Sequence, residues 1–199
     1  MLYSWGSYNS TFILSTDKTY LYALWQKVCT NSDQQAFQAL FELLYLRLVN
    51  FSIAYVHSRE PAEEIVGDVF LKLWMNRAAT GEITHVETYL FTAVRHQSLN
   101  YLRKFSTYHV ISTDQTQEIH MVDTASPADA TEWKELQFKL QQAVDALPPE
   151  RKRIFKLVKE EGFTCKQVAE ILQLSPRTVE TQLFKAVKQL RITLQGISH

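Results

Sequence analysis

Hydrophobic positions recur at helical spacing along most of the chain. Between Phe37 and Tyr55, apolar residues follow one another every three or four positions, which is the period of one face of an α-helix. The same spacing predicts further helices over residues 19–30, about 58–74, 86–104, 133–146 and 150–160. Gly and Pro number only five each, and the segments between them are rich in helix-forming residues. The pattern predicts an all-α protein.

This helical spacing disappears over residues 106–131, where Ser, Thr, Asp and Gln dominate. The break predicts a flexible linker between two helical domains, over residues 31–105 and 132–199, with a lead-in and first helix over 1–30. The formal net charge of the chain is zero, but residues 107–135 hold one Lys/Arg against six Asp/Glu, whereas residues 136–199 hold eleven against six. An acidic linker therefore precedes a basic domain, and a basic surface favours a nucleic-acid partner.

Residues 164–190 carry the signals of two short helices joined by a tight turn. Thr164 and Gln167 have the spacing of a capping box, in which each residue satisfies a free amide of the other. Ser175 is placed to cap a second helix, and Pro176 suits its first position. The pattern predicts a helix-turn-helix.

The second of these helices has an apolar and a polar side. The apolar side, expected to face inward, consists of Val179, Leu183, Ala186, Val187 and Leu190. The polar side lies near the amino end, where such helices meet base edges, and continues with lysines suited to phosphates. The candidate DNA-binding residues are Ser175, Arg177, Thr178, Thr181, Gln182, Lys185 and Lys188. The alternative is the solvated charged face of a purely structural hairpin.

The segment LPPERKRIFKLVKEEGFTCKQVAEILQLSPRTVETQLFKAVKQLR resembles region 4 of the extracytoplasmic-function sigma factors of the sigma-70 family, which reads the minus-35 promoter element. A similar pattern occurs in response regulators, so this segment also fits a helix-turn-helix regulator that does not join polymerase core. A receiver domain would need alternating strands and helices, whereas residues 31–105 show helix periods throughout. The resemblance implies an alternative sigma factor that directs promoter-specific transcription initiation.

The N-terminal half resembles sigma region 2 of the same family, in the strings AFQALFELLYLRLVNFSIAYV, SREPAEEIVGDVFLKLW and VETYLFTAVRHQSLNYLRK. In the family the second of these helices docks on the clamp helices of the polymerase large subunit. The resemblance therefore implies a polymerase-binding surface that includes Glu64, Asp68, Lys72 and Trp74. Trp74 fits a core position equally well. Gly67 stands where the family usually has Gln, which lowers helix propensity.

The third string is expected to carry a second DNA-binding surface. With Leu90, Val94, Tyr101 and Phe105 placed inward, a polar, cationic and aromatic face remains, which is suited to capturing unpaired bases. Its candidate residues are Tyr89, Thr92, Arg95, His96, Asn100, Arg103 and Lys104. The resemblance implies recognition and melting of the minus-10 element, with the loop over 77–85 holding a flipped base. His96 also fits a neutral surface role.

The remaining features favour a cytoplasmic protein without a catalytic site or a cofactor. No metalloprotease motif, nucleophile elbow or Gly-rich phosphate loop is present, and Cys29 and Cys165 lie outside any metal-binding or disulfide pattern. The start of the chain lacks the pattern of a secretory signal, and no membrane insertion is expected. The implied partners are RNA polymerase core, through the clamp helices and flap, promoter DNA, and a membrane anti-sigma factor, which the family suggests.

Overall fold

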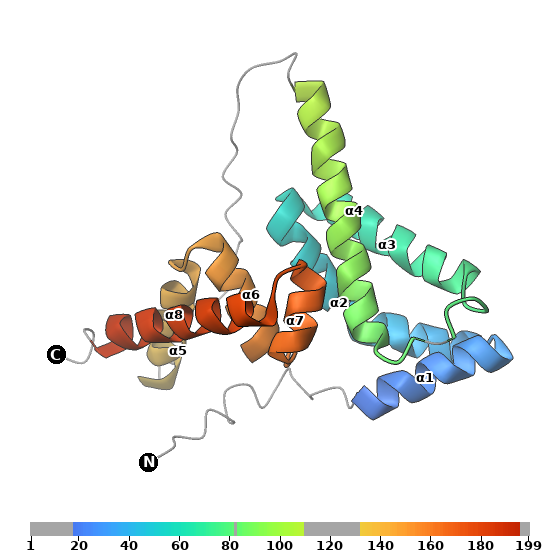
Figure 1. Ribbon diagram of the computed structural model, residues 1–199, viewed down its shortest axis with the longest axis horizontal. Helices are drawn as coiled ribbons and strands as arrows, with labels where there is room; N and C mark the ends of the chain where they lie inside the picture. Colours follow the sequence, from blue (N-terminus) through green and yellow to red (C-terminus); the bar gives the residue numbers. More distant parts are fainter. Residues whose placement is uncertain (1–17, 82, 110–131, 196–199) are drawn as a thin grey trace. The chain divides into compact units, whose positions relative to one another are not determined.

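The computed structural model describes residues 18–81, 83–109 and 132–195. All regular secondary structure in these ranges is helical. The helices are α1 (Lys18–Asn31), α2 (Gln34–Val56), α3 (Arg59–Met75), α4 (Val86–His109), α5 (Glu132–Asp145), α6 (Pro149–Lys159), α7 (Cys165–Leu172) and α8 (Pro176–Gln195). The chain divides into two compact units, with α1–α4 in the first and α5–α8 in the second (Figure 1). The predicted all-α class is confirmed.

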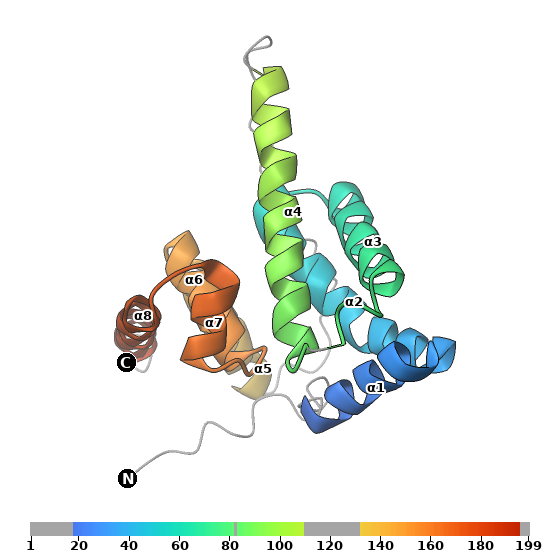
Figure 2. The ribbon, with the colours of Figure 1, turned by 45° about the vertical axis from the view of Figure 1, so that its right-hand side comes forward.

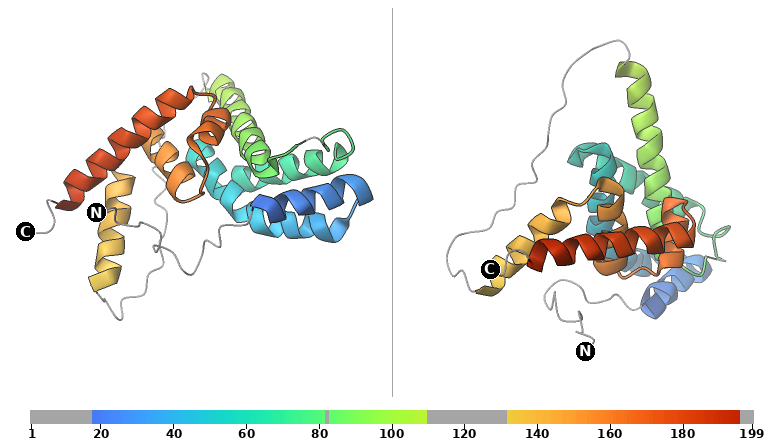
Figure 3. Two further views of the ribbon diagram at one scale, coloured as in Figure 1. Left: turned by 60° about the horizontal axis from the view of Figure 1, so that its bottom comes forward. Right: turned by 60° about the vertical axis from the view of Figure 1, so that its left-hand side comes forward.

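The first unit is built around α2, which packs against α1, α3 and α4 (Figures 1 and 2). The inward stripe of α2 contains Leu40, Leu44 and Leu48, spaced one turn apart and fully buried. Trp25 of α1 and Phe91 of α4 are also fully buried, and α1 lies along α2 in the left view of Figure 3. The periodicity seen in the sequence is thus the packing face of the central helix.

The same helix α2 is long and apolar enough to cross a membrane, judged by length and composition alone. Its most apolar window is 44% buried inside the unit. It also carries Arg47, whose Nη2 pairs with Glu87 Oε1 of α4 at 2.6 Å. Packing against three neighbouring helices accounts for its apolar content.

A buried pair of hydroxyls also joins α2 to α4. Ser52 Oγ and Ser98 Oγ lie 2.9 Å apart, and both residues are fully buried. Because Ser98 Oγ donates its proton to Val94 O at 2.8 Å, the Ser52 hydroxyl is the donor within the pair. Both buried hydroxyls are therefore satisfied, as burial of polar groups requires.

Helix α4 is longer than the sequence predicted. It continues to His109, so residues 106–109 are helical and the predicted linker cannot begin at 106; residues 110–131 lie outside the described residues. The carboxyl end of α4 extends past α2 and α3 (Figures 1 and 2). For this reason the inward placement of Phe105 was wrong: its side chain is 47% exposed and packs on half-buried Tyr101, with ring centroids 4.6 Å apart.

In the second unit, α5, α6 and α7 all pack against the long helix α8 (Figure 1). One part of the core is a buried cluster contributed by α5, α6, α8 and the turn after α5, with Leu140, Leu183 and Val187 packed on it. The cluster consists of Ala143, Val144, Leu147, Phe155, Ala186 and Leu190. Phe163, before α7, is also buried.

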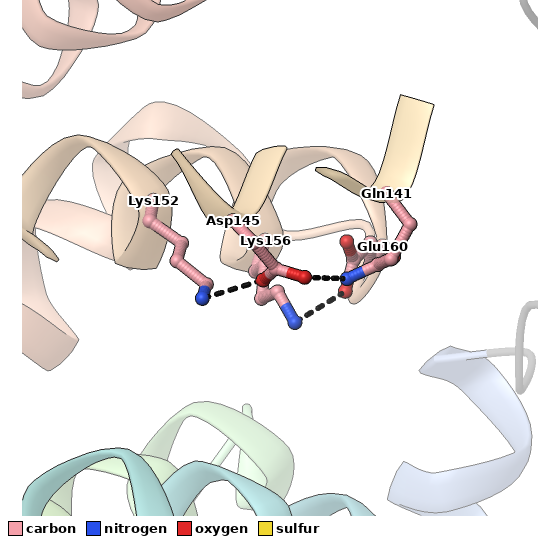
Figure 4. A network of polar contacts seen from close by, with 5 residues as sticks. All are labelled: Gln141, Asp145, Lys152, Lys156 and Glu160. Atoms are coloured by element: carbon pink, nitrogen blue, oxygen red, sulfur yellow. Dashed lines mark hydrogen bonds and ion pairs between the residues drawn. The ribbon is translucent and has the colours of Figure 1, made fainter. Parts of the chain in front are cut away.

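A polar network fastens α5 to α6 at the edge of this unit (Figure 4). Lys152 Nζ lies 2.5 Å from Asp145 Oδ1, and Gln141 Nε2 donates to Asp145 Oδ2 at 3.0 Å. Burial acts to raise the pKa of Asp145, but these two hydrogen bonds and the charges of Lys152 and Lys156 outweigh it and lower the pKa below its usual value. Burial raises the pKa of Glu160, although Lys156 Nζ lies 3.9 Å away and opposes the rise.

Candidate functional site

The helix-turn-helix of α7 and α8 begins with the predicted capping box. Thr164 Oγ1 accepts from the Gln167 amide at 3.3 Å, and Gln167 Oε1 accepts from the Thr164 amide at 3.1 Å. Just before it, Gly162 adopts a left-handed conformation with φ of 73°, which is the conformation that glycine adopts without a steric cost. Local chemistry therefore sets where α7 starts.

The turn into α8 is also held by local contacts. Gln173 ends α7 in a left-handed conformation with φ of 53°, and the Leu174 amide donates to Ala169 O at 2.9 Å. Ser175 Oγ then accepts from the Thr178 amide at 3.0 Å, and Pro176 is the first residue of α8. The predicted cap and start of the second helix are both confirmed.

The inner side of α8 also lies as predicted. Val179, Ala186 and Leu190 are buried, and half-buried Leu183 and Val187 pack on the core cluster. The orientation of the helix is thereby fixed, and its opposite side faces outward.

Six of the seven predicted DNA-binding residues in and beside α8 fall into two groups. Arg177, Thr181, Lys185 and Lys188 are exposed on the outer side. Ser175 and Thr178 are exposed as well, but their hydroxyls bond to each other at 2.7 Å. The hydroxyl of Thr181 is also engaged, because its Oγ1 donates to Arg177 O at 2.8 Å.

Gln182 belongs to neither group, because its side chain turns toward α6. It is half-buried, and its Oε1 accepts from Arg151 Nε at 3.1 Å. The same guanidinium donates from Nη1 to Gln189 Oε1 at 3.2 Å. Arg151 therefore holds Gln182 within the domain.

Two residues on the outer side of α8 were missed. Glu180 is exposed, and Phe184 is 69% exposed. Both share a helix face with Arg177, Thr181 and Lys188, because residues three and four positions apart lie side by side. The spacing of three and four positions from Arg177 identifies both, although one is acidic and the other is apolar.

The outer face of α3 combines charged and apolar side chains. Glu64, Asp68 and Lys72 are exposed, as predicted. Leu71 and Met75 lie on the same side and are 57% and 68% exposed. We call these five residues the α3 face. Apolar side chains exposed within a charged surface are typical of a protein-binding site.

Trp74 is not part of the α3 face. Its indole is half-buried and packs on Phe37 of α2, with ring centroids 4.9 Å apart. Arg77 covers the indole, with its Cζ 4.4 Å from the ring centroid. Of the two roles that the sequence left open, the structure favours core packing.

The candidate residues of α4 differ in how freely they are presented. Tyr89, His96, Asn100, Arg103 and Lys104 are exposed, and Arg103 Nη1 donates to Asn100 Oδ1 at 3.4 Å. Thr92 and Arg95 are half-buried instead. Thr92 Oγ1 donates to Thr88 O at 2.8 Å, and Arg95 Nη1 is shielded from solvent.

Each of the two units matches one region of a known protein family. The family description "Sigma-70 region 2" matches residues 40–107, and "Sigma-70, region 4" matches residues 137–190. Together the two matches cover more than half of the chain, one in each unit. The chain belongs to the sigma-70 family, in its extracytoplasmic-function group.

Individual relatives agree with this assignment. The chain is 20% identical to the sigma factor YlaC of Bacillus subtilis, over 79% of this chain and 91% of the relative. It is 24% identical to the extracytoplasmic-function sigma factor SigL of Mycobacterium tuberculosis, over 80% and 89%. The protein is therefore an alternative sigma factor, which binds RNA polymerase core and directs promoter-specific transcription initiation; a regulator of the response-regulator type is not favoured.

Two solved structures share the fold. The sigma factor RpoE of Bartonella quintana, in complex with the anti-sigma factor NepR, matches with a TM-score of 0.58 and 20% identity, over 80% of this chain and 96% of that chain. CnrH, in complex with the cytosolic domain of CnrY, matches with a TM-score of 0.51 and 16% identity, over 91% and 99%.

In this sigma factor the loop after α3 is anchored to α1. Thr80 Oγ1 donates to Asn76 O at 2.9 Å, while Trp25 Nε1 donates to Thr80 O at 3.3 Å and Gln26 Nε2 to Gly81 O at 3.4 Å. The middle of the segment over 77–85, in which a base-binding pocket was predicted, is therefore fastened to α1.

Helices α3 and α4 pack against each other, and the charges of α3 reach Tyr101 of α4. Burial raises the pKa of Tyr101, and the negative charges of Glu64 and Glu60 raise it further. Glu64 belongs to the α3 face, whereas Tyr101 lies on α4 between Asn100 and Arg103. Two surfaces expected to have different partners therefore adjoin in the first unit.

The two cysteines of the sigma factor are free and half-buried. Burial raises the pKa of the Cys29 thiol, which the nearby charge of Arg77 partly opposes. A raised pKa keeps the thiol protonated and poorly reactive. Among the described residues, no three His, Cys, Asp or Glu side chains gather as a metal site.

Proposed function

We propose that the two units divide promoter recognition between them. The first unit binds polymerase core and the minus-10 element, and the second reads the minus-35 element. The observation that carries the proposal is the outer side of α8, where Arg177 and Thr181 stand near the amino end and Lys185 and Lys188 follow. This is the part of a helix-turn-helix that enters the major groove.

On α8 the base contacts and the phosphate contacts come from different residues. Arg177 can present two donors to a guanine edge. Phe184 offers apolar contact, which suits the methyl group of thymine. Lys185 and Lys188 are point charges that attract phosphates and fix the register without reading sequence.

The α3 face is the proposed contact with the polymerase clamp helices. Its carboxylates, Glu64 and Asp68, supply charge for orientation, while Leu71 and Met75 supply apolar area that binding removes from water. A second contact with core is expected at the flap. Trp74 contributes indirectly, by holding the carboxyl end of α3 against α2.

The exposed residues of α4 are proposed to hold the separated minus-10 strand. Arg103 and Lys104 provide cations for the backbone, and Tyr89 provides an aromatic ring on which an unpaired base can stack. His96 and Asn100 lie on the same helix and offer hydrogen-bonding groups. Thr92 and Arg95 are less available, because both are half-buried.

The sigma factor is proposed to act in the cytoplasm under the control of an anti-sigma factor. Two structures of the same fold are complexes with such regulators or their domains, NepR and CnrY. The polymerase supplies the chemistry of transcription, so the chain itself needs neither a catalytic site nor a cofactor. We propose no insertion into the membrane, in keeping with the packing of α2.

Reconstitution tests this proposal. The full chain is added to bacterial core polymerase with a promoter library randomised in both upstream elements, and transcript starts are sequenced. We expect starts at a defined distance from two enriched elements, and none with core alone. Equal enrichment with core alone, or starts without any preferred element, would contradict promoter recognition by this chain.

A further inference from the structure

The outer side of α8 includes an acidic residue, Glu180, among its cationic and apolar side chains. Glu180 is exposed and lies three residues after Arg177 and four before Phe184, so all three share one helix face. It stands within the first two turns of α8, where helix-turn-helix residues reach base edges. A carboxylate therefore lies in the middle of the surface that is turned toward DNA.

This carboxylate is available to a partner outside the chain. Within the described residues, the side chain of Glu180 makes no hydrogen bond and no ion pair. Asp145 and Glu160 of the same unit are instead held by Lys152 and Lys156 (Figure 4). Arg177, although one turn away, forms no ion pair with Glu180.

The charges around Glu180 limit which groups of the DNA its carboxylate can contact. Arg177, Lys185 and Lys188 draw this side of α8 toward the phosphates, which repel a carboxylate. An ionised carboxylate only accepts hydrogen bonds, so it needs a donor on a base edge. In the major groove both cytosine N4 and adenine N6 are donors, but adenine also presents its N7 acceptor, which repels a carboxylate. Cytosine N4 is therefore the donor that Glu and Asp accept from.

We propose that Glu180 is a specificity-determining residue that accepts a hydrogen bond from N4 of a cytosine in the minus-35 element. The proposal rests on the proposed function of α8. It also explains how a negative charge is tolerated there: the charge favours sites with a cytosine at one position and disfavours those that present an acceptor.

The test compares four full-length proteins in holoenzyme with the same bacterial core: the parent, Glu180→Gln, Glu180→Ala and Glu170→Gln. Glu170 is the matched control, because it is an exposed carboxylate on α7 rather than on α8. Each holoenzyme transcribes a promoter library that is randomised only in the upstream element. Enrichment of each base at each position is scored.

We expect the parent and Glu170→Gln to share a cytosine preference at one position. In Glu180→Ala the enrichment of cytosine at that position should fall by about fivefold or more. Glu180→Gln should change the preferred base from cytosine to adenine, because Gln pairs with N6 and N7 of adenine. An unchanged cytosine preference in both Glu180 variants would overturn the proposal. A uniform rise in transcription from all upstream sequences, without a change in base preference, would also overturn it. Absence of any upstream preference in the parent would instead overturn the proposed function of α8.

Discussion

Arg77 lies over the indole of Trp74, with its Cζ 4.4 Å from the ring centroid, and donates from Nη1 to Trp74 O at 2.8 Å. Its Nε donates to Ser32 Oγ at 3.0 Å, in the turn between α1 and α2. With Phe37 on the neighbouring helix, these contacts close the carboxyl end of α3 against α2. The relationship makes Trp74 a structural residue.

Replacement of Trp74 should therefore reduce stability before it affects binding. Trp74→Ala removes the contacts with Phe37 and Arg77, and we expect the free energy of unfolding to fall by about 2–4 kcal/mol, somewhat less than for a fully buried Trp. Trp74→Phe should recover most of this loss. Denaturant titration measures the change; a Trp74→Ala protein as stable as the parent but impaired in core binding would return Trp74 to the interface.

The α3 face should respond in the opposite way. Charge reversal of Glu64 and Asp68 to Lys changes only exposed side chains, so unfolding should shift by no more than about 0.5 kcal/mol for each. Binding to core polymerase should weaken at least about tenfold, through lost charge complementarity. Glu42→Lys, on the exposed side of α2, is the control. Equal affinity of the double variant and the control for core would contradict the assignment of this face.

Gly67 offers a test of helix propensity on the same helix. A Cβ added at Gly67 would meet nothing within 4 Å, so alanine is accommodated without a clash. We expect Gly67→Ala to raise the free energy of unfolding by about 0.5–1 kcal/mol, because glycine loses more backbone freedom on folding. Thermal or denaturant unfolding checks this. A destabilised variant would show that the backbone at this position is not an ordinary helix.

The sequence predicted best what local chemistry decides. The caps at Thr164 and Ser175 depend on residues within three positions of one another, and both lie where the pattern placed them. Periodicity likewise oriented α8, because an apolar face must be buried.

The errors came from contacts between distant residues. No local pattern reveals that Arg151 binds Gln182, thirty-one positions away, or that Arg77 covers Trp74 while reaching back to Ser32. Phe105 fits the inward stripe of α4, but the helix there extends beyond its packing partners, so periodicity no longer implies burial.

The network of α5 and α6 predicts how stability depends on pH (Figure 4). The pKa of Asp145 is lowered in the folded protein, so its ionised form stabilises the fold above the pKa of the unfolded chain. This contribution is lost as the pH falls below about 4. Asp145→Asn should be less stable than the parent at neutral pH, and the two should converge in acid. Denaturant titrations at several pH values, followed by the amide signals of α5 and α6, measure the free energy of unfolding of both proteins. If the two free energies change with pH in parallel, the pairing of Asp145 with Lys152 contributes nothing to stability.

Arg177 and Lys185 lie on the same side of one helix yet should contribute differently to promoter binding. Arg177→Ala removes a two-pronged donor from a base edge, so it should cost about 1–3 kcal/mol on the preferred upstream element and relax the preference at one position. Lys185→Ala removes a point charge, so it should weaken all sequences alike and reduce the salt dependence of binding by about one unit of slope. Each variant, as full-length protein in holoenzyme, is titrated against matched and scrambled elements at several salt concentrations. Lys159→Ala is the control for lost charge, because Lys159 is exposed on α6. Equal weakening of matched and scrambled DNA by Arg177→Ala would remove Arg177 as the reading residue and leave Thr181 as the next candidate on the same face.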